Sequence, residues 1–192
     1  MVSLVEFKEL CKSVNPDEIV EEVLLSFDAM HVSQENITLI QSELSKAYSV
    51  PADRIFIWIV GSAKLGFSIS ETGEKKRYRS YGADSDIDVA VVSPCIYRSI
   101  WNELSAHAHN QPLWPWKAKK LGDYHVAGWL RPDHFPRTPW VMKCNAWKDT
   151  FSKLSKDPRF SRRQVSGGLF YSLNDLRRYL RRAVNQCVAI ER

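Results

Sequence analysis

The chain lacks any hydrophobic run long enough to span a bilayer. Its longest apolar stretch covers residues 55–60 of 192, whereas a membrane-spanning helix needs about 20 consecutive apolar residues. The N-terminal residues 1–7 include Glu6 and show no basic leader followed by an apolar segment, which is the pattern of a secretory signal. The sequence therefore predicts a cytoplasmic protein that has no membrane partner.

Cysteine is scarce, and its spacing excludes two common kinds of small-protein framework. The four cysteines, Cys11, Cys95, Cys144 and Cys187, lie far apart in the sequence, so neither a disulfide pattern nor the paired spacing of a zinc site is present. The five histidines show no metal-ligand spacing either. Three of the cysteines fall on the apolar stripes of expected helices, which predicts buried, reduced thiols.

Charge is unevenly distributed, although the net charge of +5 is modest. Residues 1–50 hold three Lys or Arg against nine Asp or Glu, whereas residues 148–192 hold eleven against four. The basic C-terminal part is suited to phosphate-bearing partners such as RNA, and ordinary solubility explains it equally well. The acidic N-terminal part would repel nucleic acid, or would face a basic partner.

Residues 1–50 have the pattern of an N-terminal helical segment made of three amphipathic helices, because apolar residues recur through them at helical spacing. Asn15, which is followed by Pro16 and two acids, is suited to cap the second helix, and Ser33 the third. Residues 51–192 then form the main domain. The two parts are expected to make one compact unit.

Four strands are expected after residue 50. Residues 54–60 are nearly all β-branched, aromatic or otherwise apolar, and residues 86–92 follow the same pattern. This pattern is typical of strands buried on both faces, and we expect the first to be central in its sheet. Weaker strand patterns cover residues 124–130 and 164–171. The fold class is therefore α/β (α+β), a small mixed sheet flanked by helices.

Helices are expected between and after the strands, over residues 97–108, 140–154 and 172–187. The last begins with Ser-Leu-Asn-Asp, a capping pattern, and carries four arginines on its outer side, which makes it a C-terminal basic helix. Residues 110–122 and the basic stretch 70–85 are expected to be irregular.

Tryptophan is concentrated in the second half of the chain. Helical spacing places Trp140 and Trp147 in the core. Trp114 and Trp116 remain as candidates for stacking a nucleotide base, with ordinary packing as the alternative.

Two strand ends carry the candidate chemistry. The first strand runs into Gly61-Ser62, where glycine lets the backbone approach a phosphate, and a helix starting there would offer it free N–H groups. The second strand begins Asp86-Ile87-Asp88. Residues two apart on a strand point to the same side, so both carboxylates project together while Ile87 turns into the core. Adjacent carboxylates repel each other, and a cation such as Mg²⁺ relieves this repulsion.

Residues 54–93 resemble the superfamily of DNA polymerase β-like nucleotidyltransferases. The resemblance lies in three features in order: an apolar strand that ends in Gly-Ser, a variable loop, and Asp-x-Asp within a second apolar strand. The resemblance implies that Gly61 and Ser62 hold the triphosphate of a nucleotide, with ATP the first candidate, and that Asp86 and Asp88 hold two Mg²⁺ or Mn²⁺ ions. It implies transfer of a nucleoside monophosphate to a hydroxyl of an RNA (such as tRNA), a protein or a second nucleotide, with release of pyrophosphate.

Two further residues are assigned through this resemblance. Lys64 lies just after Gly-Ser and is placed to reach a phosphate, with a surface lysine as the alternative. The superfamily usually has a third catalytic carboxylate on a later strand, and no later strand here has an apolar-Asp-apolar pattern. Asp133, which follows the strand expected at 124–130, is our candidate, with a loop aspartate as the alternative. Lys75 and Arg79, in the long loop between the two motifs, are also within reach of phosphates or nucleic acid in this interpretation.

The chain resembles compact bacterial members of the superfamily that belong to toxin–antitoxin or antiviral defence systems. Two other classes stay open. One is a catalytically degenerate module that binds a nucleotide or a partner protein, which the unassigned third carboxylate favours and the intact Asp-x-Asp pair disfavours. The other is a basic RNA-binding protein that acts through the arginine-rich last helix.

Overall fold

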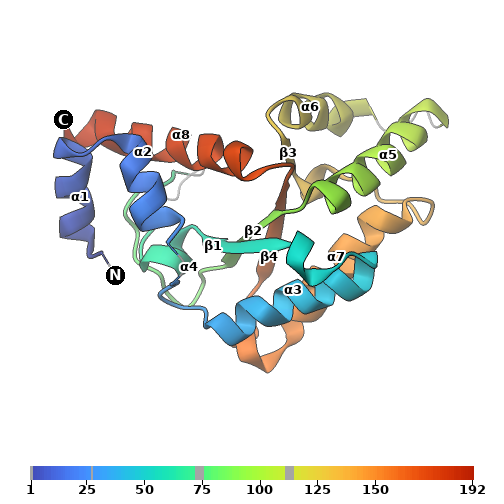
Figure 1. Ribbon diagram of the computed structural model, residues 1–192, viewed down its shortest axis with the longest axis horizontal. Coiled ribbons are helices and arrows are strands. Elements are labelled where there is room, and N and C mark those ends of the chain that lie inside the picture. The colour runs from blue at the N-terminus through green and yellow to red at the C-terminus, as the bar shows by residue number, and fades with distance from the viewer. Residues whose placement is uncertain (1, 27, 72–75, 111–114) are drawn as a thin grey trace.

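The computed structural model describes residues 2–26, 28–71, 76–110 and 115–192, with the backbone alone for 115–117. Its sheet has four strands in the order β1-β2-β4-β3. β2 runs parallel to β4, and the other two neighbouring pairs are antiparallel. The strands are β1 (Phe56–Val60), β2 (Ile87–Val92), β3 (Trp129–Leu130) and β4 (Val165–Phe170). A mixed sheet flanked by helices confirms the predicted fold class (Figure 1).

Helices make up most of the remaining described chain. They are α1 (Leu4–Ser13), α2 (Pro16–Ile19) with its π-helical continuation η1 (Val20–Leu24), α3 (Gln34–Tyr48), α4 (Ser62–Leu65), α5 (Pro94–Asn110), α6 (Pro115–Val126), α7 (Met142–Lys156) and α8 (Leu173–Glu191). Short 3₁₀ turns are η2 (Ala52–Arg54), η3 (Pro132–His134) and η4 (Pro158–Phe160). The predicted caps are confirmed, because Asn15, Ser33 and Ser172 each accept a backbone N–H bond at the start of α2, α3 and α8.

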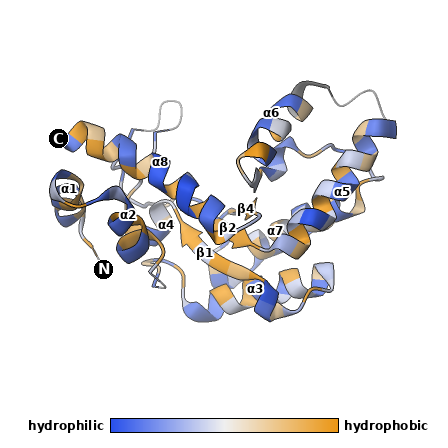
Figure 2. Cartoon of the chain, turned by 45° about the horizontal axis from the view of Figure 1, so that its top comes forward, coloured by the Kyte–Doolittle hydropathy of each residue, from blue (hydrophilic) through white to orange (hydrophobic). Residues whose placement is uncertain are grey.

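The sheet separates two hydrophobic cores. Helices α1, α2 and α8 pack over one face, and α3, α5 and α7 over the other (Figure 1). Along β2, Val89 and Val91 enter the core under α3, whereas Ala90 and Val92 enter the core under α8. Asp88 alternates with Val89 and therefore lies on the α8 face. The strands are hydrophobic along most of their length, whereas α8 is largely hydrophilic outside its buried stripe (Figure 2).

The position of β1 corrects one prediction. Residues 54–60 were expected to form a central strand buried on both faces, but β1 lies at the edge of the sheet and Phe56 is 50% exposed. The two inner strands are β2 and β4, and every residue of β2 except Asp88 is buried. Apolar composition indicates a strand but does not tell which neighbours cover it.

The stretch between α5 and β3 also differs from the prediction. Residues 110–122 were expected to be irregular and 124–130 to form a strand, but α6 continues to Val126 and only Trp129 and Leu130 pair with β4. Leu121 is 1% exposed and anchors the helix in the core. This packing overrides the local strand preference of the aromatic and β-branched residues that follow it.

Of the predictions for the tryptophans, one is confirmed and one is wrong. Trp147 is 1% exposed and lies in the core as expected, but Trp140 is 79% exposed, so its assignment to the core is wrong. The reason is that α7 begins only at Met142, which leaves Trp140 outside the helical periodicity. The candidates for base stacking, Trp114 and the side chain of Trp116, lie outside the described residues.

The cysteines are free thiols, and three of them are completely buried, as predicted. They are Cys11, Cys144 and Cys187. Burial raises the pKa of Cys11 to about 11. A thiol that stays protonated at neutral pH is a poor nucleophile and a poor metal ligand, so Cys11 acts as a core residue.

Opposite charges of the N-terminal part and of helix α8 meet at the surface of the molecule. Arg177 of α8 pairs with Glu21 at 2.6 Å, and Arg181 pairs with Asp17 of α2 at 3.2 Å. The acidic N-terminal part therefore faces part of the basic C-terminal helix, and this intramolecular contact offsets some of the charge on both.

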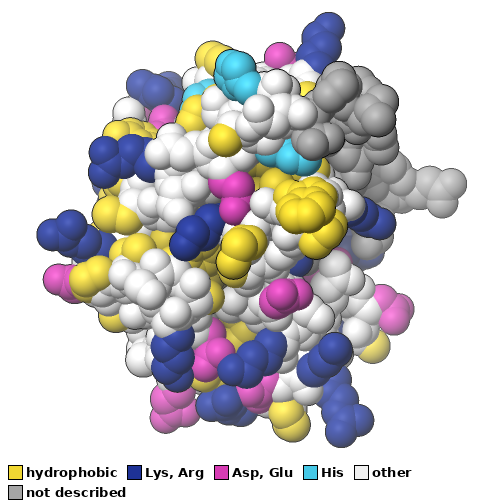
Figure 3. Space-filling model, turned by 90° about the vertical axis from the view of Figure 1, so that its right-hand side faces the viewer, with side chains coloured by type: hydrophobic (Ala, Val, Ile, Leu, Met, Phe, Trp, Pro, Cys, Tyr) yellow, Lys and Arg dark blue, Asp and Glu magenta, His cyan; other side chains and the backbone are white. Residues whose placement is uncertain are grey.

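The remaining surface is mixed in character. On the face shown in Figure 3, hydrophobic side chains form separate patches among Lys, Arg, Asp and Glu. Such scattered apolar groups are ordinary for a protein surface. Within the described ranges, no helix is long and apolar enough to cross a membrane.

Candidate functional site

The end of β1 lies directly against the start of β2. Val60, the last residue of β1, is paired with Asp88. Gly61 follows with φ 65° and ψ −152°, a conformation that side-chain-bearing residues rarely adopt. A Cβ atom on Gly61 would lie 2.8 Å from Oδ2 of Asp88. The backbone conformation thus favours glycine, a Cβ would push the Asp88 carboxylate aside, and the fold brings the Gly-Ser and Asp-x-Asp motifs into one place.

Asp86 and Asp88 project to the same side of the chain. Both are exposed, whereas Ile87 between them is 2% exposed, as the alternation along a strand requires. The two aspartates line one cleft together with Gly61 and Ser62. α4 begins at Ser62, so a short helix follows the glycine directly.

The cleft that holds these residues is large and basic. Its volume is about 1580 Å³. Elements from all parts of the sheet and from α7 and α8 contribute to its walls. Its basic side chains are Arg79, Arg131, Arg137, Lys148, Lys156 and Arg162, and its acidic ones are Asp86, Asp88 and Asp133. A cleft that is lined by more cations than carboxylates suits the binding of a metal ion together with phosphates.

Arg163, which precedes β4, holds the segment that leads into Asp86. Its Nη1 donates to the carbonyl oxygens of Gly82, Ala83 and Ser85, at 2.6, 2.8 and 3.0 Å. The backbone N–H of Ile87 adds a bond to the carbonyl of Gln164, at 2.8 Å. A charged donor shared by three carbonyls makes strong bonds and fixes the approach to the Asp-x-Asp motif.

Arg163 also packs against an aromatic ring. The Arg163 guanidinium lies 4.8 Å from the centre of the Tyr81 ring, and His31 stacks on the same ring with 4.1 Å between the ring centres. Burial raises the pKa of Tyr81, and the Asp86 carboxylate adds to the rise while Arg163 opposes it. Sequence reasoning missed Arg163 and Tyr81, because no local pattern links the two.

The strand position beside Asp88 has no carboxylate. In the parallel pairing of β2 with β4, Asp88 is the partner of Ser166. The Ser166 hydroxyl accepts a bond from the side-chain amide of Gln164 at 3.3 Å. The nearest strand thus offers an uncharged oxygen ligand next to the Asp pair.

Asp133, the predicted third carboxylate, lines the same cleft but lies in the 3₁₀ turn η3 instead of on a strand. Its Oδ1 accepts from Nε of Arg131 at 2.8 Å, and its Oδ2 lies 3.9 Å from His134. Asp133 is thus paired with Arg131 at the wall of the cleft. Its role as a catalytic carboxylate stays a prediction.

Lys64 does not occupy the position predicted for it. The side chain is 4% exposed, and its ammonium donates to the carbonyl oxygens of Ser26 and Asp28, the latter at 2.6 Å. Burial lowers the pKa of Lys64. The helix α4 turns this side chain away from the cleft and toward the segment before α3. The prediction that Lys64 binds a phosphate is therefore wrong in this structure, and the residue supports the fold instead.

Two aromatic side chains line the same cleft as the two aspartates. Tyr179 of α8 and Trp129 of β3 both line the cleft, and their ring centres lie 4.9 Å apart. Trp129 stacks on Phe170 of β4, with 5.8 Å between the ring centres. Burial raises the pKa of Tyr179, and the Asp88 carboxylate raises it further.

The ligand set at Asp86 and Asp88 fits Mg²⁺ or Mn²⁺. Hard cations of this kind take one or two carboxylates and complete their shell with water and substrate phosphates. Within the described residues, no group of three or more His, Cys, Asp or Glu is placed to hold a metal ion. In this arrangement Asp86 and Asp88 would supply two carboxylates, and phosphate oxygens beside Gly61 and Ser62 would supply further ligands.

Comparison with known proteins does not extend this picture. No protein-family model, curated protein or solved structure matches the chain. What supports a function is therefore the geometry of the cleft itself.

Proposed function

We propose that the protein is a Mg²⁺- or Mn²⁺-dependent nucleotidyltransferase that moves a nucleoside monophosphate from a nucleoside triphosphate, with ATP the first candidate, to a hydroxyl. The observation that carries the proposal is the contact of Gly61 with Asp88. It places a glycine that lets a phosphate approach directly beside a pair of carboxylates suited to a divalent cation.

In this proposal, the residues of the cleft have separate roles. The backbone of Gly61 and Ser62 lies against the triphosphate, Asp86 and Asp88 hold the cation, and the cations of the cleft balance the phosphate charge. The bond between the α-phosphorus and the bridging oxygen of the β-phosphate breaks, and a bond from the acceptor oxygen to the α-phosphorus forms. Pyrophosphate leaves, and the acceptor's proton passes to solvent. When bound, Mg²⁺ neutralises phosphate charge and makes the hydroxyl more acidic.

The neighbour of Asp88 supports a second candidate function. Ser166 occupies the adjacent strand position, where a third carboxylate would strengthen metal binding. A protein with two carboxylates and no third would bind a metal–nucleotide complex without efficient turnover. In that case the molecule is a nucleotide-binding module.

A transfer assay separates these two functions. The protein is incubated with each α-labelled nucleoside triphosphate, Mg²⁺ or Mn²⁺, cellular RNA and cellular protein, beside an Asp86→Ala/Asp88→Ala variant. The proposal predicts label in an acceptor with the wild type alone. Binding of the nucleotide without transfer would assign the binding module, and the absence of both binding and transfer would refute both functions.

A further inference from the structure

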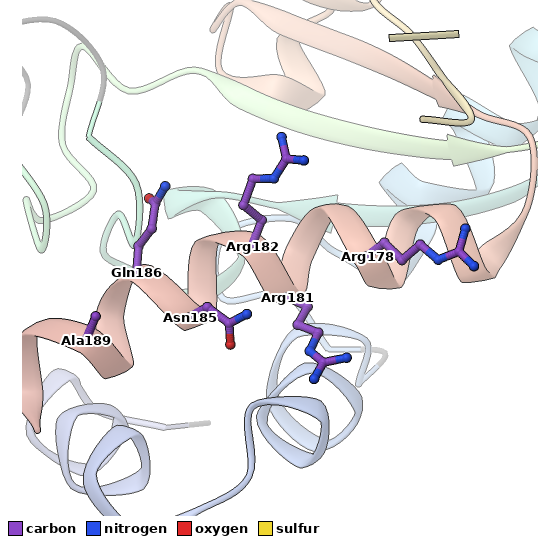
Figure 4. Close-up of a pocket in the computed structure, with 6 residues that line it drawn as sticks. All are labelled: Arg178, Arg181, Arg182, Asn185, Gln186 and Ala189. Atoms are coloured by element: carbon purple, nitrogen blue, oxygen red, sulfur yellow. The ribbon is translucent and has the colours of Figure 1, made fainter. Parts of the chain in front are cut away.

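The exposed side of helix α8 holds a shallow hollow of about 470 Å³ (Figure 4). It is lined by Arg178, Arg181, Arg182, Asn185, Gln186 and Ala189. Among the described residues, those that line the hollow are thus basic, amide-bearing or small, and none is acidic. Arg178 and Arg181 keep 72% and 52% of their side-chain surface exposed, and Arg182 is exposed as well. The hollow therefore presents positive charge to solvent.

Another helix of the same chain shows what the arginines of α8 bind. On one side of α8, Arg177 donates from Nε and Nη2 to the two carboxylate oxygens of Glu21, at 2.6 and 3.2 Å. One turn further along α8, Arg181 lies 3.2 Å from Asp17. Two arginines four residues apart are thus paired with two acids four residues apart, on α2 and its continuation η1. Bidentate pairing of this kind adds geometric specificity to the attraction of charge.

Arg178 and Arg182 repeat this spacing one residue further along the sequence, which places them about 100° further around the helix. In Figure 4, Arg181 points toward α2 and Arg182 points away from it. Arg178 lies 3.6 Å from Asp175 of its own helix, and none of the residues one turn before or after Arg182 on α8 is acidic. This second pair of arginines therefore lacks the acidic helix that α2 supplies to the first.

The rest of the hollow suits a helix that lies along α8. Arg178, Arg182, Asn185 and Ala189 follow one another at intervals of four, three and four residues, so they form one line about 16 Å long over three turns. This line lies opposite the stripe that α8 buries in the core. Ala189 allows a partner helix to approach closely at one end, and the arginines supply charge at the other. An amphipathic helix that carries acids in one part and small or apolar residues in the next matches both ends.

A protein helix matches this surface better than a nucleic acid does. Each strand of a nucleic acid carries one negative charge per about 3.4 Å, whereas acids four residues apart on a helix lie about 6 Å apart, as Arg178 and Arg182 do. A nucleic-acid backbone along α8 would also lie near the carboxylates of Asp175, Asp17 and Glu21. None of the described residues that line the hollow is aromatic, so unpaired bases would find no ring there on which to stack.

We propose that the exposed side of α8 is a docking surface for an acidic amphipathic helix of a partner protein, in which two acids four residues apart pair with Arg178 and Arg182. The pairing would repeat the one that α2 and η1 make on the neighbouring side of the same helix. Neither arginine lines the cleft. The surface is therefore separate from the nucleotide site, and the inference does not depend on the proposed function.

The test titrates the protein with a model helix and follows the titration by nuclear magnetic resonance, which detects millimolar affinities. The probe is an alanine-based peptide of about 20 residues, long enough to be helical in water, with glutamates in pairs four residues apart. The control peptide has glutamine at the same positions. We expect the glutamate peptide alone to shift the backbone amide resonances of the exposed side of α8, between Arg178 and Ala189.

Two variants test the arginines directly. Arg178→Gln/Arg182→Gln should bind the glutamate peptide about tenfold more weakly, because each exposed ion pair contributes up to about fivefold. The matched control, Lys12→Gln/Lys46→Gln, removes the same charge from exposed positions of α1 and α3 and should bind as the wild type does. The charge reversal Arg178→Glu/Arg182→Glu should bind a peptide with lysine in place of glutamate. Circular dichroism checks that each variant is folded.

Four results would overturn the inference. Three of them are the absence of shifts with the glutamate peptide, equal shifts with both peptides, and equal affinity of the wild type and Arg178→Gln/Arg182→Gln. The fourth is tighter binding of a single-stranded RNA of equal charge to the same two arginines, which would assign the surface to nucleic acid.

Discussion

Gly61 at the end of β1 and Asp88 at the start of β2 are in such close contact that a single added carbon on the glycine would lie 2.8 Å from a carboxylate oxygen. The pairing of Val60 with Asp88 fixes this contact through the sheet. It joins a backbone segment suited to phosphate with a side chain suited to a divalent cation. The predictions below follow from this relationship and from the residues that support it.

The first prediction concerns Gly61→Ala. The new methyl group would strain a backbone with φ 65° and would displace the Asp88 carboxylate. We expect a loss of about 1–3 kcal/mol in the free energy of unfolding and a fall in Mg·ATP affinity, measured by chemical denaturation and calorimetry. Gly122→Ala is the control, because a Cβ there meets nothing within 4 Å and α6 gains a better helix former. An unchanged affinity in Gly61→Ala would show that the contact has no part in binding.

The second prediction is that Arg163 positions Asp86. Arg163→Ala would remove three hydrogen bonds to the segment 82–85. Groups that orient metal ligands typically contribute about 10–100-fold to metal affinity, so we expect a drop of this size in Mn²⁺ binding, followed by electron paramagnetic resonance. Arg159→Ala is the control, because Arg159 pairs with Asp157 at the surface. Equal metal affinity in the two variants would contradict the positioning role.

The third prediction separates fold from function at Lys64. Lys64→Met would leave the carbonyl oxygens of Ser26 and Asp28 without their buried donor. We expect a loss of about 1–3 kcal/mol in the free energy of unfolding. At temperatures at which the variant is still folded, we expect no loss of Mg·ATP affinity. Lys46→Met, at an exposed position, should change neither. If Lys64→Met weakens Mg·ATP binding without destabilising the protein, then Lys64 does reach a phosphate.

The fourth prediction adds a ligand. Ser166→Asp would place a carboxylate on β4 next to Asp88. Because the charge of the ligand set governs the affinity of such sites, we expect about tenfold tighter Mn²⁺ binding and, if the third ligand limits turnover, faster transfer of label. Ser152→Asp, at an exposed position of the cleft on α7, is the control. Tighter binding in the control alone would show that Ser166 does not adjoin the metal position.

The sequence predicted the parts of this molecule that depend on local pattern. The alternation in residues 86–92 predicted that Asp86 and Asp88 share a side and that Ile87 is buried, and both are seen. It did not predict Arg163, because 81 residues separate it from the Gly82 carbonyl that it binds. Lys64 follows Gly-Ser directly, yet the turn of α4 buries it.

The same distinction explains the errors in the fold. Strand and helix preferences are weak beside tertiary packing. Residues 124–130 have aromatic and β-branched character, but Leu121 fixes α6 in the core and the helix continues to Val126. The edge position of β1 follows from the order of strands, which no window of sequence contains.

The central claim, that Asp86 and Asp88 hold a metal–nucleotide complex beside Gly61, is tested most directly by calorimetric titration of Mg·ATP and the other Mg·NTPs into the wild type and into Asp86→Asn/Asp88→Asn. Both aspartates are exposed, so the variant should fold, which circular dichroism checks. We predict saturable binding of at least one Mg·NTP to the wild type and none to the variant. Absence of binding to the wild type, or equal binding to both proteins, would contradict the account.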